Sequence, residues 1–304
     1  PECMEEDVAE IYAQQKNIGY DSVFIQGKSD SEKYMKKYFN DWQAQGVTSV
    51  LHEKRGGYAN NTSSIYSLAD KAEAEGVRIL TGTEVKGFEF GSNSNAVTGI
   101  ETDKGLIKCD NVIVGAGPWV KTFWDMMDLP NRISIKNSNG EMHNDVPMWQ
   151  YWFLTEGVLG VEPGFLKTED GQMPPVLHVD TDAPLYSDVD KSLITDKLWG
   201  IYYKPDFHFN GIQGGASPYK VGKAGGEGIS VDPYGPKSSE FTLDDDFAHM
   251  WTSALAHCHK RFEGKSSLFK KGATGGLGCF TPDSFPIFDT FRENVYLIAD
   301  SNHG

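Results

Sequence analysis

The feature that most constrains the fold is a short apolar run that ends in small residues. Val112-Ile-Val114 leads directly into Gly115-Ala-Gly117. An uninterrupted apolar run is typical of a strand buried on both faces, and Pro118 favours the start of a helix over 119–127. In α/β sheets, ligands lie at the carboxyl ends of strands, where small residues let them approach the backbone. The turn is therefore a candidate ligand site, although any strand-to-helix turn can use glycine.

The residues around this strand predict several further elements. Ser63 and Ser64 are suited to cap a helix that ends at Gly76. Short strands are then expected over 77–80, 84–90, 96–102 and 106–109. Because short turn-forming loops separate the last three, we expect these to form an antiparallel meander.

The rest of the chain predicts helices and an antiparallel sheet. Apolar residues at helical spacing predict helices over 7–16 and 31–45, the second with Trp42 in its apolar stripe. Another helix is expected to start at Thr242, and a final strand at 295–299. Strand candidates in the middle of the chain lie over 148–155, 176–180 and 198–204. Loops rich in Gly, Pro and Asp separate them, so an antiparallel sheet is predicted there.

Charge and composition exclude some classes of partner. The 304 residues include 28 basic and 43 acidic side chains, for a net charge of −15. Such a chain is unsuited to tracking nucleic-acid phosphates or adhering to an anionic membrane, and no apolar stretch is long enough to span a bilayer. The four cysteines form no CxxC pair, which favours a reducing, cytoplasmic location. Small substrates and protein partners remain.

Metal and hydrolase chemistry have no positive signal in the sequence. His257 and His259 are two residues apart, so on a helix their directions diverge by about 200° and they cannot share one ion. No metal site is therefore expected. No GxSxG motif occurs, so a nucleophile elbow is not predicted.

Several motifs, taken in their order and spacing, resemble one family. They are Gly56-Gly57, Glu75-Gly-Val-Arg-Ile79, Glu84-Val85, Val97-Thr-Gly-Ile-Glu-Thr102, Cys109-Asp-Asn-Val-Ile-Val-Gly-Ala-Gly-Pro-Trp119, Trp199-Gly-Ile-Tyr-Tyr-Lys-Pro205, Gly276-Leu-Gly-Cys-Phe-Thr-Pro-Asp-Ser-Phe-Pro-Ile287, Asn294-Val-Tyr-Leu-Ile-Ala299 and Ser301-Asn-His-Gly304. The set resembles the FAD-dependent D-amino acid oxidase superfamily, in its glycine/sarcosine oxidase and dimethylglycine dehydrogenase branch. The resemblance covers about 56–125 and 272–304 well, and the middle only through 199–205.

This resemblance implies a cofactor site for FAD. Val85 would contact the adenine end of FAD, and Ala116, Gly117 and Trp119 would line the cofactor cleft. Asp283 would lie in the turn beneath the flavin, or would only cap backbone amides. The residues expected to approach the flavin ring, where main-chain donors can hold negative charge, are Ser301, Asn302, His303 and Gly304. The turn at 115–117 and this closing segment are thus expected to meet around one flavin.

The resemblance also implies a substrate-facing tyrosine, which corresponds to Tyr202. Strand alternation places Lys204 on the same face and Tyr203 on the other. Tyr202 and Lys204 are therefore the candidate catalytic residues, with Lys204 compensating for an arginine that this family uses to hold the substrate carboxylate. The alternative is a tyrosine in the sheet core and a solvated lysine.

Three departures from the family pattern qualify these expectations. The GxGxxG fingerprint that places a pyrophosphate on a helix N-terminus does not occur in this sequence. We therefore expect a fragment truncated at both ends that lacks the N-terminal βαβ unit. Gly278 stands at the position of the substrate-binding arginine, and Cys279 is expected to be a small core residue that does not attach the flavin covalently.

Together these features predict an α/β protein with an α+β insertion. An incomplete Rossmann-like FAD-binding domain is expected over 56–125 and 272–304, and a helical segment with an antiparallel substrate domain over 1–55 and 126–271. The resemblance implies oxidation of a small amine or N-methylated amino acid, such as glycine, sarcosine or dimethylglycine, by hydride transfer to FAD. Oxygen or an electron-carrier protein would be the acceptor. The alternatives are a flavin dehydrogenase of another small substrate and a non-catalytic interaction subunit of the same fold.

Overall fold

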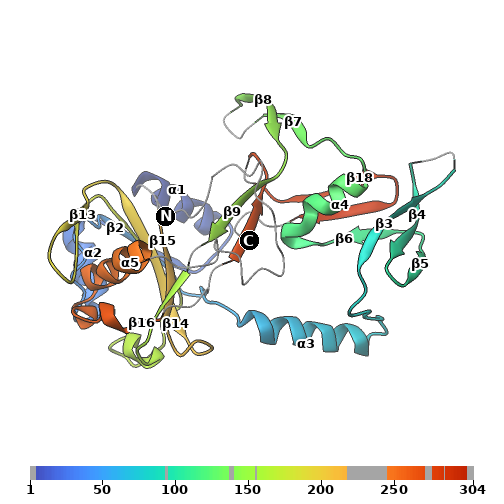
Figure 1. Cartoon of the computed structure of the whole chain (residues 1–304). Coiled ribbons are helices and arrows are strands. Elements are labelled where there is room, and N and C mark those ends of the chain that lie inside the picture. The colour runs from blue at the N-terminus through green and yellow to red at the C-terminus, as the bar shows by residue number, and fades with distance from the viewer. Residues whose placement is uncertain are drawn as a thin grey trace. The chain divides into compact units, whose positions relative to one another are not determined.

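The chain forms two compact units in the computed structural model (Figure 1), which describes residues 5–92, 95–136, 140–154, 156–217, 245–270, 276–283 and 285–299. The first unit combines residues 1–59, 154–221 and 236–276, and the second combines 60–153, 222–235 and 277–304. Residues 126–153, grouped from the sequence with the substrate domain, fall in the second unit. The assignment of an FAD-binding and a substrate domain stays a prediction.

The first unit begins with two helices and a strand pair. The helices are α1 (Glu5–Asn17) and α2 (Lys28–Tyr38), and β1 (Ser22–Gln26) pairs antiparallel with β2 (Ser49–Glu53). The sequence does not predict this pair, because both strands are short and lack strict alternation of polar and apolar residues. The helix expected over 31–45 is wrong beyond Tyr38. There the chain turns, and Trp42 forms an isolated bridge with His259 and is buried.

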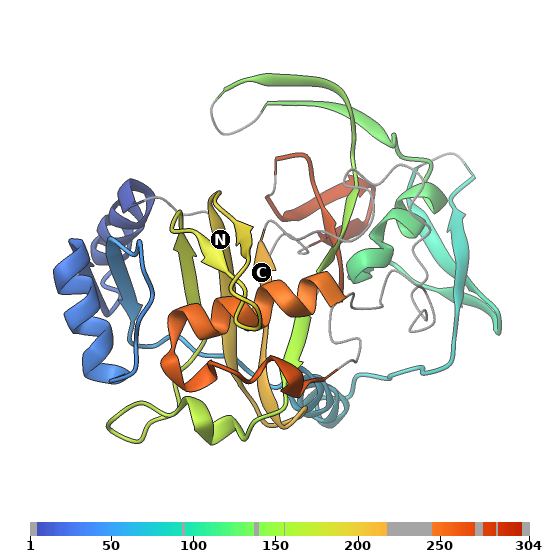
Figure 2. The same ribbon diagram turned by 60° about the vertical axis from the view of Figure 1, so that its left-hand side comes forward.

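A five-stranded antiparallel sheet is the centre of the first unit. Its strands, in spatial order, are β11 (Leu177–Thr181), β14 (Trp199–Asp206), β15 (Gly211–Ser217), β10 (Glu156–Leu159) and β16 (Phe269–Lys270). The predicted antiparallel sheet is therefore confirmed for the strands expected over 176–180 and 198–204. The strand expected over 148–155 is not part of it, because residues 150–154 pair with 276–280 in a separate sheet. The helix α5 (Asp245–Cys258) lies across one face of this sheet (Figure 2). The smaller elements are β12 (Leu185–Tyr186), β13 (Leu193–Thr195) and the 3-10 helices η2 (Pro163–Leu166), η4 (Lys260–Phe262) and η5 (Ser266–Leu268).

Strand alternation divides the sheet into two chemically different faces. Along β14, Ile201 and Tyr203 are buried in the core formed with α5, whereas Tyr202 and Lys204 are half-buried on the other face. The predicted alternation of these residues is confirmed. Cys258 is fully buried in the same core, as its place in the apolar stripe of the helix predicts.

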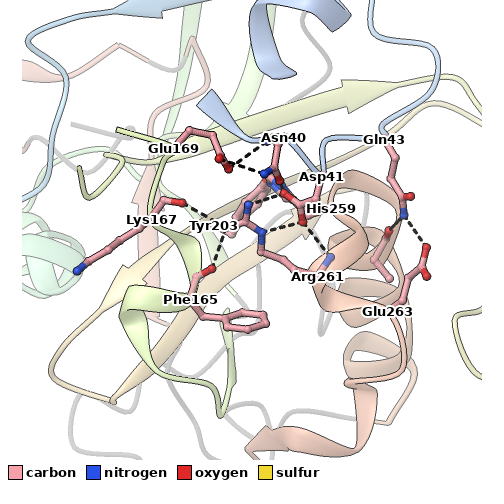
Figure 3. Close-up of polar contacts among 11 residues, drawn as sticks. Asn40, Asp41, Gln43, Phe165, Lys167, Glu169, Tyr203, His259, Arg261 and Glu263 are labelled. Carbon is pink, nitrogen blue, oxygen red and sulfur yellow. Dashed lines mark hydrogen bonds and ion pairs between the residues drawn. The ribbon is translucent and has the colours of Figure 1, made fainter. Parts of the chain in front are cut away.

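A polar network fastens the end of this core (Figure 3). The Arg261 guanidinium donates two bonds to the carboxylate of Asp41 and further bonds to the carbonyl oxygens of Phe165 and Lys167. Burial alone would raise the pKa of Asp41, but the neighbouring His259 and Arg261 outweigh it and hold this pKa well below its usual range. His259 is buried, its Nε2 lies 2.7 Å from the Tyr203 hydroxyl, and burial lowers its pKa. The network thus joins four segments that are far apart in the sequence.

The second unit contains a meander, a three-stranded sheet and two strand pairs. The meander consists of β3 (Val85–Phe90), β4 (Val97–Thr102) and β5 (Gly105–Lys108), as predicted. The three-stranded sheet has the order β18 (Ile287–Arg292), β19 (Val295–Ala299) and β6 (Val112–Val114). The pairs are β7 (Arg132–Lys136) with β8 (Met142–Pro147) and β9 (Gln150–Leu154) with β17 (Gly276–Phe280). The helix after β6, predicted over 119–127, forms as η1 (Gly117–Trp119) followed by α4 (Val120–Met126).

The helix α3 (Asn61–Ala74) precedes the meander and differs in detail from its prediction. It starts three or four residues earlier than expected, because the Asn60 side chain, and not Ser63 or Ser64, caps the helix by accepting a bond from the Ser63 N–H at 2.9 Å. The prediction of a strand over 77–80 is wrong: these residues belong to none of the sheets formed by the described residues. Val77 and Leu80 are more than half exposed, so burial does not favour a strand there.

The helices of the described ranges contain no segment long and apolar enough to cross a membrane. 

We predict that the Arg261 network contributes measurably to the stability of the first unit. Arg261→Lys removes the two-pronged contact with Asp41 and most of the carbonyl bonds, so the free energy of unfolding should fall by about 1–3 kcal/mol. The control, Lys36→Gln, breaks an exposed ion pair with Glu32 on α2 and should change the free energy of unfolding by less than about 0.5 kcal/mol. Urea unfolding of both variants measures the difference. Equal effects would show that the network is no stronger than a surface pair.

Candidate functional site

The turn after β6 is held at the edge of a parallel strand pair. β6 and β19 run parallel, with Val112 opposite Val295 and Val114 opposite Leu297. Their carboxyl ends therefore lie at the same edge of the sheet, which is where ligands bind in α/β folds. The turn itself is closed by a bond from the Trp119 N–H to the Ala116 carbonyl oxygen at 3.1 Å.

The predicted cofactor-lining residues leave space at this edge. Gly117 has a φ of +52°, and a methyl group on either Gly115 or Gly117 would meet no heavy atom of the described residues within 4 Å beyond its chain neighbours. Trp119 is 36% exposed. By contrast, a methyl group on Gly99 in the meander would meet a Leu106 side-chain atom at 2.9 Å. The turn is thus open on the side where FAD would have to approach the backbone, so its residues fit such a cofactor.

Residues outside the turn keep it in place. The Tyr151 hydroxyl donates to the Pro118 carbonyl oxygen at 3.0 Å. Asn294, at φ +58°, donates to the carbonyl oxygens of Val97 and Asp110 at 2.7 and 2.5 Å and accepts from the Val97 N–H at 2.9 Å. Asn294 thereby ties the start of β19 to β4 and to the chain entering β6. The sequence offered one signal for this role, because asparagine tolerates a left-handed backbone at a turn.

The closing segment expected near the flavin, Ser301, Asn302, His303 and Gly304, lies outside the described residues. It follows in sequence from β19, whose last residue, Ala299, lies at the same sheet edge as the 115–117 turn. Whether the two segments meet around one cofactor stays a prediction.

The other predicted cofactor residues lie in the second unit as well. Val85 is the first residue of β3 and is half-buried opposite Thr102. Asp283 accepts bonds from the Thr281 hydroxyl at 2.8 Å and from the Phe285 N–H at 3.2 Å. Its described contacts are therefore local to the turn, which is the alternative role considered for it.

Two residues that depart from the family pattern are explained by packing. Cys279 is fully buried in the second core, as expected for a core cysteine. At Gly278, a methyl group would lie 2.5 Å from the Phe280 ring. The ring of Phe280 thus crowds the position at which the family pattern has an arginine.

A second polar cluster lies on the half-buried face of the antiparallel sheet. Strand register aligns His178, Tyr202, Gly215 and Glu156 across four neighbouring strands. The Tyr202 hydroxyl donates to Glu156 Oε1 at 2.7 Å, and Gln213 Nε2 donates to Glu156 Oε2 at 2.9 Å. The sequence predicts Tyr202 for this face but misses Glu156 and Gln213, because the register across four strands cannot be derived from one sequence.

Burial dominates the electrostatics of this cluster. It raises the pKa of Glu156, although the bond from Tyr202 and the positive charge of Lys204 act in the opposite direction. Burial, followed by the charge of Glu156, also raises the pKa of Tyr202 well above its usual value. Tyr202 is therefore a neutral donor at physiological pH, and Glu156 is a carboxyl group whose ionisation is penalised by its surroundings.

Lys204 is engaged within its own strand. Its Nζ lies 2.5 Å from Asp206 Oδ2 and 4.5 Å from the centre of the Tyr58 ring. Burial alone would raise the pKa of Asp206, but the bond from Lys204 outweighs it, so this pKa is lowered. A substrate carboxylate would thus have to compete with Asp206 for Lys204. The two predicted groups of site residues lie in different units, with Tyr202 and Lys204 in the first and the cofactor candidates in the second.

No group of three or more metal-ligating side chains that could hold an ion occurs among the residues for which side chains are described. 

Comparisons with known proteins show what the chain is similar to. Residues 4–147 match the family model described as FAD dependent oxidoreductase. Among solved structures, L-proline dehydrogenase from P. horikoshii is similar at a TM-score of 0.65 with 19% identity, over 99% of this chain and 66% of that one. Glycine oxidase from Geobacillus kaustophilus is similar at a TM-score of 0.57 with 14% identity, over 99% of this chain and 64% of that one. These matches show the fold.

Among curated proteins, NADH oxidase of Mycoplasma genitalium is 42% identical over 45 residues, which are 15% of this chain and 9% of that protein. The chain thus spans less than two thirds of the length of this relative and about two thirds of the solved structures named above. The predicted fold class, a Rossmann-like FAD-binding part with an antiparallel substrate sheet, is confirmed, and so is FAD as the cofactor of the family. Through residues 4–147, a little under half of its length, the chain is similar to the family of FAD-dependent oxidoreductases.

Proposed function

We propose that the chain is part of an FAD-dependent oxidoreductase that oxidises a small amine or N-methylated amino acid, such as glycine, sarcosine or dimethylglycine. When bound, FAD accepts the hydride that leaves the carbon next to the substrate nitrogen. The observation that carries the proposal is the open 115–117 turn at the carboxyl edge of β6 and β19, with β6 and the turn inside the range that matches the family model. Dehydrogenation of proline and oxidation of glycine, named for the two structural neighbours, are compatible with an amine substrate.

In this proposal, the second unit holds the cofactor. Val85 contacts the adenine end, while Ala116, Gly117 and Trp119 line the cleft. Asp283 shapes the turn beneath the flavin. The remaining contacts to the flavin ring come from Ser301, Asn302, His303 and Gly304. The main-chain donors of these last residues would stabilise negative charge on the flavin ring.

The first unit supplies the substrate-facing residues. Tyr202 presents a neutral hydroxyl, held by Glu156, that orients the substrate. Lys204 is the candidate anchor for a substrate carboxylate, in competition with Asp206. Oxygen or an electron-carrier protein is the acceptor, and the location is cytoplasmic.

One observation favours a second candidate, a flavin dehydrogenase of another small substrate. Gly278 replaces the arginine that holds a carboxylate in the family pattern, and the Phe280 ring crowds this position. A substrate without a carboxylate would not need that arginine. A non-catalytic subunit of the same fold is the third possibility, and it would carry no flavin.

The flavin spectrum of the purified full-length protein tests the proposed function. We expect absorbance near the visible flavin bands and anaerobic bleaching by sarcosine, dimethylglycine, glycine or L-proline. A flavin that none of these amines bleaches would contradict the amine substrate and favour the second candidate. Protein without any flavin would favour the non-catalytic subunit.

We predict that Gly115→Leu weakens FAD binding without unfolding the protein. Its side chain would occupy the open space at the turn, while the backbone at Gly115 requires no left-handed conformation. The FAD content per protein should fall by at least about tenfold, since a ligand cannot share space with a packed side chain. Gly164→Leu, at an exposed glycine of η2 with ordinary space around it, is the control and should retain FAD. Full FAD content in Gly115→Leu would show that the cofactor does not bind at this turn.

We predict that two adjacent tyrosines respond differently to loss of the hydroxyl group. Tyr202→Phe removes the donor to Glu156 and should lower kcat/KM for the amine by about tenfold, the effect of one hydrogen bond to a charged group. Tyr203→Phe removes a hydroxyl on the core face and should lower thermal stability but leave kcat/KM within about twofold. Steady-state kinetics and thermal melts of both variants measure this. An unchanged kcat/KM in Tyr202→Phe would discard its assignment as a substrate contact.

A further inference from the structure

A short loop of the first unit is anchored on both sides. On one side, the Gln43 N–H donates to the Cys258 carbonyl oxygen at the end of α5 at 2.9 Å. On the other side, the Gly27 N–H donates to the Thr48 carbonyl oxygen at 2.7 Å. We call residues 44–47, which lie between these two anchors, the strap. Any movement of the strap is therefore confined to a few residues between fixed points.

The strap covers the end of the edge strand β11. The Gln45 carbonyl oxygen accepts a bond from the hydroxyl of Thr181, the last residue of β11, at 2.8 Å. Gly46 has a φ of +81°, and a methyl group there would collide with the same hydroxyl oxygen. The strap thus fits closely over β11, which pairs directly with β14 in the five-stranded sheet.

His257 of α5 holds the middle of the strap. Its Nε2 accepts a hydrogen bond from the Gln45 N–H at 3.1 Å. A ring nitrogen can accept such a bond only when it carries no proton, so His257 is neutral here and has its proton on Nδ1. The ring also packs edge-on against Trp199 of β14, with centroids 5.1 Å apart. A second proton, on Nε2, would point at the Gln45 N–H and replace the bond by a repulsive contact.

His259 secures the anchored side of the loop (Figure 3). Its ring is buried, its Nε2 lies 2.7 Å from the Tyr203 hydroxyl, and its Nδ1 lies 3.6 Å from Asp41 Oδ1. Burial lowers the pKa of His259; Asp41 acts against this shift and Arg261 adds to it. Burial also raises the pKa of Tyr203, so its hydroxyl is neutral. Neutral His259 thus keeps its bridge partner Trp42 in the core.

Burial also determines the protonation of His257. It lowers the pKa of His257, and no charge of the described residues outweighs it. The ionisable side chains on the neighbouring elements, next to the residues that contact it, are Asp180 and Asp182 beside Thr181, Asp196 and Lys197 before Trp199, and Lys260 and Glu263 after α5. With the strap open, the ring is in water and its pKa returns to about 6.5. The stability of the closed strap is therefore fully present above about pH 6.5 and is lost as the pH falls toward the lower pKa of the closed state.

We propose that residues 44–47 form an acid-sensitive strap, which neutral His257 holds over the end of β11 and which proton uptake at Nε2 of His257 releases. Released, the strap moves away from Thr181, and the end of the edge strand becomes accessible to water. His259 keeps the anchored side closed, so the opening is local. The inference concerns the first unit alone and does not depend on a bound flavin.

Hydrogen exchange resolved to single amides tests the strap in the full-length protein, from about pH 7.5 to about pH 5. After correction for intrinsic exchange, the protection of the Gln45 amide should fall by up to about tenfold per pH unit below about pH 6.5, because opening takes up one proton. The protection of the anchoring Gln43 amide should change by less than about twofold. Aspartates such as Asp41 do not contribute, because an unfolded aspartate takes up its proton only near about pH 3.9.

Two variants assign the effect to His257. In His257→Gln, a side-chain amide oxygen can accept the Gln45 N–H and does not titrate. The protection of the Gln45 amide should then stay within about twofold over the whole range. The matched control is His249→Gln, which changes a half-buried histidine about two turns earlier in α5. It should keep the pH dependence of the wild type.

Three results would overturn the inference. They are a protection of Gln45 that does not change with pH in the wild type, a pH dependence that His257→Gln retains, and an equal loss of protection at Gln43 and Gln45, which would indicate global unfolding in acid. Should His257→Gln fail to fold, NMR titration of the His257 ring in the wild type decides. A midpoint below about pH 6.5 supports the strap, and a midpoint at or above this value overturns it.

Discussion

The parallel pairing of β6 with β19 is the constraint on which the second unit depends. Val112–Val114 and Val295–Leu297 are almost two hundred positions apart in the chain, yet their hydrogen bonds bring the 115–117 turn and Ala299 to one sheet edge. Asn294 fixes the register at the opposite end by bonding Val97 and Asp110. Since the turn has no bulky side chain of its own, its shape depends on these strands and on Tyr151.

In the first unit, glycine residues leave space for aromatic rings on both faces of the five-stranded sheet. Gly157 leaves room for the Phe247 and Phe269 rings on the face packed by α5, and a methyl group there would lie 2.4 Å from Phe269. Gly215 leaves room for the Tyr202 ring on the other face. One face is therefore closely packed while the other carries the polar cluster of Tyr202, Glu156 and Gln213, because a glycine places no side chain on the sheet.

Much of the fold can be predicted from local patterns in the sequence, whereas the polar cluster of Tyr202, Glu156 and Gln213 cannot. Alternation correctly placed Tyr202 and Lys204 opposite Tyr203, and turn residues located the meander, because both signals depend only on neighbours in sequence. The strand expected over 77–80 failed, since an apolar run forms a strand only when a partner is available. Trp42 lies outside the helix that its spacing predicts, because its burial beside His259 outweighs the helical periodicity. Glu156 was missed for a related reason: its contact with Tyr202 spans three strands and arises only from their register.

The charges on the half-buried face of the sheet limit which ligands could be held there. Lys204 is paired with Asp206 at 2.5 Å, so an anionic ligand would have to displace Asp206 to gain that cation. The whole chain carries a net charge of −15, which disfavours the approach of an anion. Binding of a carboxylate on this face would therefore require a cation beyond Lys204.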